Sequence, residues 1–489
     1  MINSRVINIL GIVSIFLGFS MIPSALWSLY YNEPDFISFI KSSSITILVG
    51  LLFYFTTRLY VKKENKDLQS IEGFTIVSLG WITMGVFSSL PFYFSNINLS
   101  FVDSFFEAMS GLTTTGATIL GDHILIEDLS HGLLFWRSFT QFIGGMGIIV
   151  FSIAILPLLG IGGVQLFKAE VAGPTADKMT PRVKQTAKLL WGIYVGLVIL
   201  LTTILYLEGM SFFDATCHSF TTIATAGFST HSESIGFFNS PLIEWTIIVF
   251  MLIAATNFTL HYIFLSKGQI DYFKNEEFRI YLYTFFIISI IIFFNINYYK
   301  MFNWSLDSLR DSMFTTATLL TTTGFTTANY ELWPNLSVML VFILFFIGGT
   351  SGSTTGALKI IRTVLIVKYL IYEMKKLLHP NGIYNIKIGG KIIDENVVKN
   401  TLGFYLFYLF IFISSALIIS AYNIDYVTAL STAASAIGNI GPGLGDIGPT
   451  DNWSFLPDQL KILSTFLMLL GRLEIFTVMV LFSRIFWKH

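Results

Sequence analysis

A run of threonines and a glycine, "SGLTTTGATIL" at residues 110–120, interrupts a chain that is otherwise rich in Leu, Ile and Phe. Similar runs follow as "TIATAGFST" at residues 222–230 and "TLLTTTGFTTA" at residues 318–328. Threonine and glycine are weak formers of helix interiors, and glycine tolerates backbone angles that other residues avoid. Segments of this kind can aim backbone carbonyl oxygens at a cation and replace its hydration shell. The three runs therefore point to an ion pathway.

The composition indicates a membrane protein. The 489 residues are 54% hydrophobic and only 12% charged, with a mean hydropathy of +0.70, whereas a soluble domain carries about 25% charged residues. A net charge of -1 argues against a nucleic-acid partner. The single cysteine, Cys217, excludes an internal disulfide, and no His or Cys cluster has the spacing of metal ligands.

The apolar stretches predict ten membrane spans, since a helix needs about 20 apolar residues to cross the hydrocarbon core. The first lacks a clear cleavage site and is interpreted as a retained helix rather than a signal peptide. The eighth is too long for one clean span. The predicted spans are 6–28, 37–60, 73–97, 133–158, 186–207, 242–265, 279–298, 336–378, 400–421 and 460–486.

Basic residues predict the orientation of these spans. None occurs between Lys66 and Arg137, between Lys188 and Lys267, or between Lys399 and Lys461. The lysine-rich connections alternate with these gaps, and positively charged loops face the cytoplasm. Both termini are therefore expected in the cytoplasm, with Lys300 and Arg310 as exceptions on the outer side.

The Thr-Gly runs belong to a repeated unit. Each glycine follows an aspartate by thirteen positions, and aspartate is a favoured first residue of a helix. The residues between them are long enough for about three helical turns. Each unit is therefore predicted to contain a span, a short capped helix, a Thr-Gly segment and a second span. The aspartate and glycine pairs are Asp103 and Gly116, Asp214 and Gly227, and Asp311 and Gly324.

A fourth copy is expected after the ninth span, in "STAASAIGNIGPGLGDIGP". The same spacing places Thr428, another helix-capping type, opposite Gly441. Gly438 is the competing register, but Gly441 is preferred because it needs no gap. This copy keeps the glycine and lacks the threonines.

Four such segments could converge on one axis as a ring of carbonyl oxygens, with the negative ends of the short helices pointing at the ion. Oxygen ligands without a ring of carboxylates fit a monovalent cation better than Ca²⁺ or Mg²⁺. The alternative is that Thr and Gly merely pack helices closely. Acidic residues expected near the outer mouth, where they would concentrate cations, are Glu107, Asp122, Glu233, Glu331 and Asp446.

The sequence resembles the Trk/Ktr/HKT superfamily of potassium and sodium transporters. The resemblance rests on "SGLTTTGAT", "TTIATAGFST", "TLLTTTGFTT" and "NIGPGLG", in this order on four units, and covers roughly residues 70 to 489. The two additional N-terminal spans and the "GPGLG" are similar to the bacterial TrkH branch. The resemblance implies potassium uptake, a pseudo-fourfold pore in one subunit, a homodimer, and control by a cytoplasmic nucleotide-binding subunit of the TrkA type.

The resemblance also implies which residues hold K⁺, largely through their backbone carbonyls. Sodium-selective plant relatives have serine at the position of Gly116, so glycine there favours potassium. The implied filter residues are Thr114, Thr115 and Gly116; Thr225, Ala226 and Gly227; Thr322, Thr323 and Gly324; and Asn439, Ile440 and Gly441.

The overlong eighth span contains "FFIGGTSGSTTGALKIIRT", whose glycines would break a helix at mid-depth. The resemblance implies that this segment obstructs conduction below the filter, and the alternative is a packing kink. The predicted gate residues are Gly348, Gly349, Gly352, Ser353, Thr354, Thr355 and Gly356, together with Arg472. Arg472 lies inside the last span, where a charge is costly. It either repels cations below the filter or pairs with a carboxylate such as Glu474.

The predicted fold class is an all-α polytopic membrane protein of the bacterial inner membrane. It has an N-terminal two-helix hairpin and four pseudo-symmetric helix–pore loop–helix repeats around one central pore. An embedded enzyme is disfavoured because no HExxH, GxSxG or paired catalytic carboxylates occur. A transporter of an organic solute would need inverted repeats, whereas these units are parallel. K⁺ is the only expected ligand. The predicted domains are 1–68, 69–170, 171–275, 276–385 and 386–489.

Overall fold

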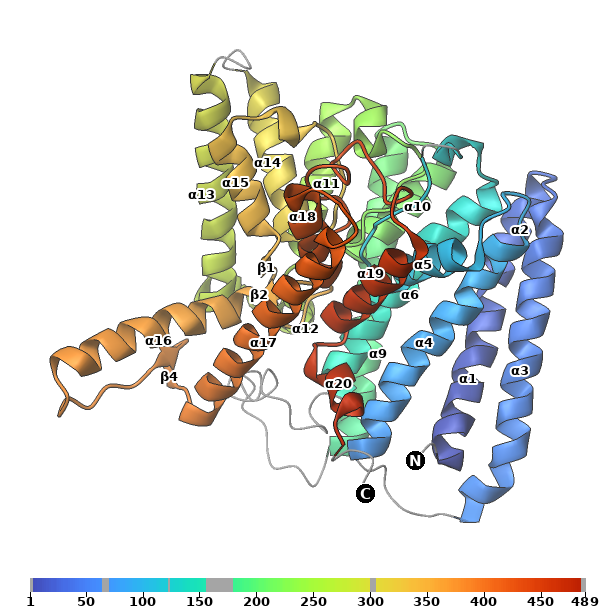
Figure 1. The fold of residues 1–489 in the computed structure, drawn as a ribbon, viewed down its shortest axis with the longest axis horizontal. Helices are drawn as coiled ribbons and strands as arrows, with labels where there is room; N and C mark the ends of the chain where they lie inside the picture. Colours follow the sequence, from blue (N-terminus) through green and yellow to red (C-terminus); the bar gives the residue numbers. More distant parts are fainter. Residues whose placement is uncertain (1–2, 64–69, 122–123, 155–178, 300–304, 485–489) are drawn as a thin grey trace.

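A computed structural model describes residues 3–63, 70–121, 124–154, 179–299 and 305–484. These residues form a bundle of helices with two short two-stranded sheets (Figure 1). Six helical segments of the described residues are long and apolar enough to cross a membrane, and two further helix pairs reach that length and hydropathy only when each bent pair is taken as one span. The prediction of an all-α polytopic membrane protein is confirmed. Asp122, Lys66, Lys300 and the ends of the predicted spans 133–158 and 460–486 lie outside the described residues.

The N-terminal hairpin is built on close contacts between glycines. Helices α1 (Ser4–Ser20) and α2 (Ile22–Tyr30) form one span, with Pro23 in the first turn of α2, and they pack against α3 (Asp35–Lys63). A Cβ atom on Gly50 of α3 would lie 2.8 Å from the Gly11 carbonyl oxygen of α1. Glycines allow two membrane helices to approach closely enough for extensive dispersion contact.

Gly50→Leu is expected to lower the stability of the protein by about 1–3 kcal/mol, because a side chain there overpacks the contact between α1 and α3. The midpoint of thermal unfolding in detergent measures the change. Gly196→Leu, in a helix where an added Cβ meets no atom within 4 Å, is the control and should leave the midpoint nearly unchanged. An equal fall in both variants would contradict the close contact.

Four units follow, and in each a long first helix is followed by a shorter helix and then by one or more further helices (Figure 1). Short 3-10 helices lie at Ile126–Asp128, Ser234–Phe238, Tyr272–Lys274, Tyr330–Leu332 and Val480–Phe482. The first unit comprises α4 (Ser70–Phe94), α5 (Phe101–Leu112) and α6 (His131–Ala154); the second α9 (Met179–Leu207), α10 (Phe212–Ile223), α11 (Pro241–Ala254) and α12 (Phe258–Lys267); the third α13 (Glu276–Tyr298), α14 (Leu306–Leu320), α15 (Asn335–Leu344) and α16 (Ile360–Leu378); and the fourth α17 (Glu395–Ser420), α18 (Tyr426–Gly438), α19 (Asp458–Arg472) and α20 (Phe476–Met479).

The second span of a unit is broken in three of the four repeats. The expected break in 336–378 is confirmed, because α15 ends at Leu344 and α16 begins at Ile360. Two other predicted spans were wrong as continuous helices. Span 242–265 bends by 94° between α11 and α12, and span 460–486 bends by 111° after α19. Apolar composition could not reveal these bends. Asn257 caps α12 through its side chain, and Glu474 has a positive φ of 55° that no straight helix permits.

The residues that cap the short helices differ from the prediction. Asp103 and Asp214 lie at the third helical position, and Ser100 and Ser211 cap the helices three residues earlier. In the fourth unit Asp425, not Thr428, is the cap. Serine and aspartate are both good caps, and an acid in the first turn is stabilised by the helix dipole, so spacing alone misplaced the start. Ser305 caps α14, which begins at Leu306, so Asp311 lies in the interior of this helix.

The loop of the N-terminal hairpin anchors α6, the last helix of the first repeat. Both carboxylate oxygens of Glu33 accept hydrogen bonds from the first turn of α6, from His131 N at 2.8 Å and Gly132 N at 3.3 Å. Asp35 accepts a further bond from Ser130 Oγ at 2.6 Å. These contacts satisfy backbone donors that a helix start leaves free, and they position α6 against the central loops.

Candidate functional site

The four loops that follow α5, α10, α14 and α18 have the same backbone conformation. The residue two positions before each glycine has φ between 52° and 53°: Thr114, Thr225, Thr322 and Asn439. The glycines also have positive φ, from 78° at Gly116 to 100° at Gly441. Gly441 rather than Gly438 therefore occupies the repeated position, and Gly438 is the last residue of α18.

The loops bond back to the short helices in one pattern. The N–H group of the residue before each glycine donates to a carbonyl five residues earlier, as from Thr115 N to Ser110 O at 2.9 Å and from Ile440 N to Ser435 O at 3.1 Å. The other two loops repeat this bond at Ala226 and Thr323. These bonds use donors of the loop and leave its carbonyl oxygens available.

The loops meet each other in a closed ring. A Cβ atom on Gly116 would lie 2.2 Å from Ala226 O, one on Gly227 2.0 Å from Thr323 O, and one on Gly324 2.1 Å from Ile440 O. A Cβ on Gly441 would lie 2.6 Å from Thr115 O, which returns to the first loop. Each glycine thus contacts the backbone of the next unit, and any side chain there would collide with it.

Most carbonyl oxygens of this ring have no hydrogen-bond partner among the described residues. Of the twelve expected filter residues, only two carbonyls accept a bond: Ala226 O from Gln141 Nε2, and Gly441 O from Ser435 Oγ and Trp453 Nε1. The other ten belong to largely buried residues. Buried carbonyls are nearly always paired with protein or water, so ten free ones in a ring form a candidate site for a cation or its water.

Side chains of the loops form hydrogen bonds with one another. Thr113 Oγ1 lies 2.8 Å from Thr115 Oγ1, and Thr321 Oγ1 lies 2.7 Å from Thr323 Oγ1. In the fourth loop, which lacks threonines, Asn439 Nδ2 donates to Thr115 Oγ1 at 3.1 Å. The asparagine therefore ties the divergent loop to the first one.

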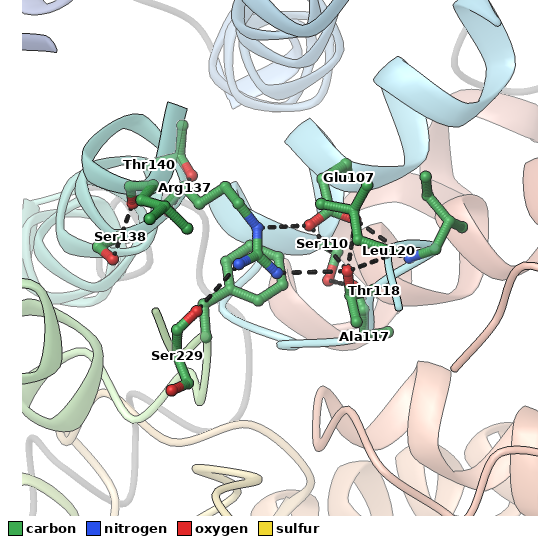
Figure 2. A network of polar contacts seen from close by, with 12 residues as sticks. Glu107, Ser110, Ala117, Thr118, Leu120, Arg137, Ser138, Thr140 and Ser229 are labelled. Atoms are coloured by element: carbon green, nitrogen blue, oxygen red, sulfur yellow. Dashed lines mark hydrogen bonds and ion pairs between the residues drawn. The ribbon is translucent and has the colours of Figure 1, made fainter. Parts of the chain in front are cut away.

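A buried ion pair supports the first two loops (Figure 2). Arg137 Nε of α6 lies 2.8 Å from Glu107 Oε1 of α5, and both side chains are buried. Glu107 also accepts from Thr118 Oγ1 and Ile119 N, just after the first loop. Glu107 was wrongly predicted to line the outer mouth, because only the packed α6 shows that its charge is paired inside the protein.

Gln141 also contacts the second loop, and the sequence analysis missed it. It lies one helical turn after Arg137, and its side-chain amide bonds to the backbone on both sides of Gly227. A polar residue one helical turn after a charged one, both within an apolar span, was the signal that could have identified it.

The segment between α15 and α16 lies against the inner ends of three of the short helices. It runs between two short parallel strands, β1 (Ile347–Gly348) and β2 (Leu358–Lys359). Thr354 Oγ1 donates to Ile223 O at 3.2 Å and accepts from Thr225 Oγ1 at 3.1 Å. Gly356 N donates to Thr322 Oγ1 at 2.8 Å, and Ala357 N to Gly438 O at 2.9 Å. The loop therefore bonds to units two, three and four.

Arg472 completes this layer from the end of α19. Its guanidinium is buried and donates to Thr354 O at 2.6 Å and to Gly144 O at 3.0 Å, so it joins the loop to the first unit. The expected alternative partner, Glu474, instead lies 2.7 Å from Arg362. Gly144 and Gly145 are packing residues, because a Cβ on Gly144 would lie 1.9 Å from Leu112 O.

Known proteins are similar to this chain over almost its whole length. The family model TrkH, described as a cation transport protein, matches residues 39–488. The Trk system potassium uptake protein TrkH of Escherichia coli K12 is 40% identical over 99% of both chains. The crystal structure of the potassium transporter TrkH from Vibrio parahaemolyticus is 37% identical, covers 99% of both chains and has a TM-score of 0.91.

The chain belongs to the TrkH family. The match includes all four loops, the segment between α15 and α16, and Arg472. TrkH proteins are cation transport proteins, so this chain is a transport protein and not an enzyme.

The acidic residues that the sequence predicts near the outer mouth of this TrkH-family chain fall into two groups. Glu233 and Asp446 are exposed, as expected for residues that concentrate cations. Glu331 is half-buried and accepts from Gly445 N at 2.6 Å, so it also holds the loop after Gly441. Burial raises the pKa of Glu331, and this hydrogen bond partly opposes the shift.

Arg137→Met is expected to destabilise the protein by about 3–5 kcal/mol, because it leaves the Glu107 carboxylate buried without its partner. Thermal unfolding in detergent measures the loss, and adding Glu107→Gln should restore part of it. Lys399→Met removes a pair between exposed side chains and should change stability by about 1 kcal/mol at most. Equal effects of the two single variants would contradict the buried pair.

Proposed function

We propose that this protein carries out potassium uptake across the cytoplasmic membrane, through a selectivity filter formed by the four loops. The observation that carries the proposal is the closed ring of buried loops with ten unpaired carbonyl oxygens. Such oxygens can replace the hydration shell of K⁺. The relatives' names, which describe potassium uptake and potassium transport, support the choice of ion. K⁺ is the cargo, and no organic cofactor is proposed.

We propose that the pore residues are those at and just before the four glycines, as the sequence indicates. Ala226 and Gly441 take part through backbone position rather than as free ligands, because their carbonyls already accept hydrogen bonds. Each repeat is proposed to be one domain, at 69–170, 171–275, 276–385 and 386–489, with 1–68 as an accessory hairpin.

The segment from Gly348 to Gly356 is proposed to be the gate. Its contacts with units two, three and four, and with Arg472, support an obstruction directly below the ring. The Arg472 charge would also repel a cation leaving the filter. A cytoplasmic nucleotide-binding subunit of the TrkA type is proposed to release the loop. The protein is proposed to be a homodimer in the bacterial inner membrane, with both termini of each chain in the cytoplasm.

Uptake of ⁸⁶Rb⁺ tests the proposal directly. The chain is expressed with its regulatory subunit in a bacterial host that lacks its own potassium uptake systems. Uptake should exceed that of the host alone and should be inhibited by unlabelled K⁺ at much lower concentrations than by Na⁺. Absence of Rb⁺ uptake from a chain that reaches the membrane, or equal inhibition by K⁺ and Na⁺, would refute potassium-selective transport.

A further inference from the structure

Helix α6 reaches from the first repeat to the backbone of the second filter loop. Arg137 and Gln141 lie four residues apart, so they share one face of the helix. Both side chains are buried. The face they form lies between α5 and the loop that contains Gly227.

The Gln141 side-chain amide bonds to the backbone on both sides of Gly227. Its Nε2 donates to Ala226 O at 2.7 Å, and its Oε1 accepts from Phe228 N at 3.1 Å. A carbonyl can only accept and an N–H can only donate, so these two bonds fix the orientation of the amide. Among the residues that the structure describes, no other side chain bonds to both peptide groups that flank a glycine of the ring.

Arg137 holds the next part of the same loop (Figure 2). Its NH1 group donates to Ser229 O at 3.0 Å, and the guanidinium stacks over the Phe228 ring with 4.2 Å to the centroid. Its other nitrogens bond to Glu107 and Thr118 of the first unit. A network whose members are mutually bonded is rigid, so Arg137 fixes the spacing between the first and second loops.

The other junctions between neighbouring loops are made differently. Between the second and third, Ser234 Oγ accepts from Thr326 N, and Gly236 N donates to Thr326 O. Between the fourth and first, Trp453 N donates to Thr118 O. These contacts lie beyond the glycines in the chain, whereas Asn439 Nδ2, two residues before Gly441, donates to Thr115 Oγ1 and so joins side chains rather than backbone groups. The two hydrogen bonds of Gln141, in contrast, hold the two backbone peptide groups that flank the glycine.

We infer that Gln141 is a positioning residue for ion selectivity, which holds the second filter loop at the spacing that suits K⁺, and that Arg137 braces it. This inference rests on the proposed potassium filter. Na⁺ is smaller than K⁺ and is favoured when the carbonyl oxygens can move inward. Pinning Ala226 O and Phe228 N to a rigid helix opposes that movement, because the Gly227 peptide groups between them cannot rotate freely.

Gln141→Met tests the inference, since it keeps a similar volume and removes both bonds. The measured quantity is the ratio of K⁺ to Na⁺ needed to inhibit ⁸⁶Rb⁺ uptake by half, per amount of protein in the membrane. Selectivity for K⁺ should fall at least about fivefold, the change that corresponds to the net contribution of one of the two hydrogen bonds lost. Ser138→Ala is the matched control, because that hydroxyl bonds to Leu134 O of its own helix and, among the described residues, to no filter loop.

A residue with a merely structural role would lower all fluxes together and leave the ratio unchanged, and that result would overturn the inference.

Gln141→Glu is the second variant, for the case in which the first fails to reach the membrane. It keeps the acceptor for Phe228 N, loses the donor to Ala226 O, and should also lower the ratio. An unchanged ratio in this variant would likewise overturn the inference. If the parent itself carries no Rb⁺, the proposed function fails; if the parent is selective and the variants match it, only the role of Gln141 fails.

Discussion

Gly116→Ser is expected to reduce ⁸⁶Rb⁺ uptake at least about tenfold and to remove most of the discrimination between K⁺ and Na⁺. A serine Cβ would lie 2.2 Å from Ala226 O, closer than any stable contact. The residue must also adopt a φ of 78°, which costs a residue other than glycine about 1–2 kcal/mol. The two loops must therefore separate, and the ring of carbonyls loses its spacing. Uptake and its inhibition by Na⁺ measure both effects.

Gly209→Ala separates the two causes. Gly209 has a φ of 107°, but an added Cβ would meet no atom within 4 Å, and the residue lies in the turn after α9. This variant carries the backbone strain without the collision, so its selectivity should equal that of the parent. Normal selectivity in Gly116→Ser would show that the ring is not the filter.

Deleting residues 350–356 is expected to raise ⁸⁶Rb⁺ uptake in the absence of the regulatory subunit by about tenfold or more. The deletion removes the bonds from Thr354 to Ile223, from Gly356 to Thr322 and from Arg472 to the loop. Each such bond contributes about 1 kcal/mol net, so together they keep the loop below the filter nearly all of the time. Because β1 and β2 are parallel, Gly349 and Ala357 lie at opposite ends of the strand pair, so a flexible linker of Gly and Ser replaces the deleted residues.

Ser353→Ala is the control for the deletion, because its hydroxyl bonds only within the loop, to Thr350 O and Thr355 Oγ1. It should leave uptake unchanged with and without the regulatory subunit. If the deletion variant reaches the membrane and its uptake still requires that subunit, the loop is not the gate. A loss of K⁺ selectivity in the deletion variant would indicate that the loop supports the filter instead.

Local conformation was predictable from the sequence. The three Thr-Gly segments, the register of the fourth loop at Gly441 and the break between α15 and α16 all appear where the residues indicate. Positive φ and interrupted helices depend on a few neighbouring residues: glycine permits them because it has no side chain, and the branched side chain of threonine disfavours a helix interior. The division into span, short helix and loop needed nothing more distant than about thirteen residues.

Helix starts and bends were predicted less well. Ser100, not Asp103, caps α5, because two good capping residues three positions apart give the same spacing signal. The 94° bend between α11 and α12 depends on Asn257 and on the loop at Gly352, whose carbonyl accepts from Phe258 N. A bend that another segment stabilises has no local signature.

The sequence by itself determined which backbone segments form the candidate pore, since a repeated spacing and residue types with special backbone preferences are properties of the chain. Only the tertiary structure decided what holds them. Glu107 and Arg137 are 30 residues apart, Gln141 and Ala226 are 85 apart, and Arg472 reaches Thr354 across 118 residues. Such pairs are fixed by how the helices pack around the ring, and a buried charge or amide finds its partner only when that packing excludes water.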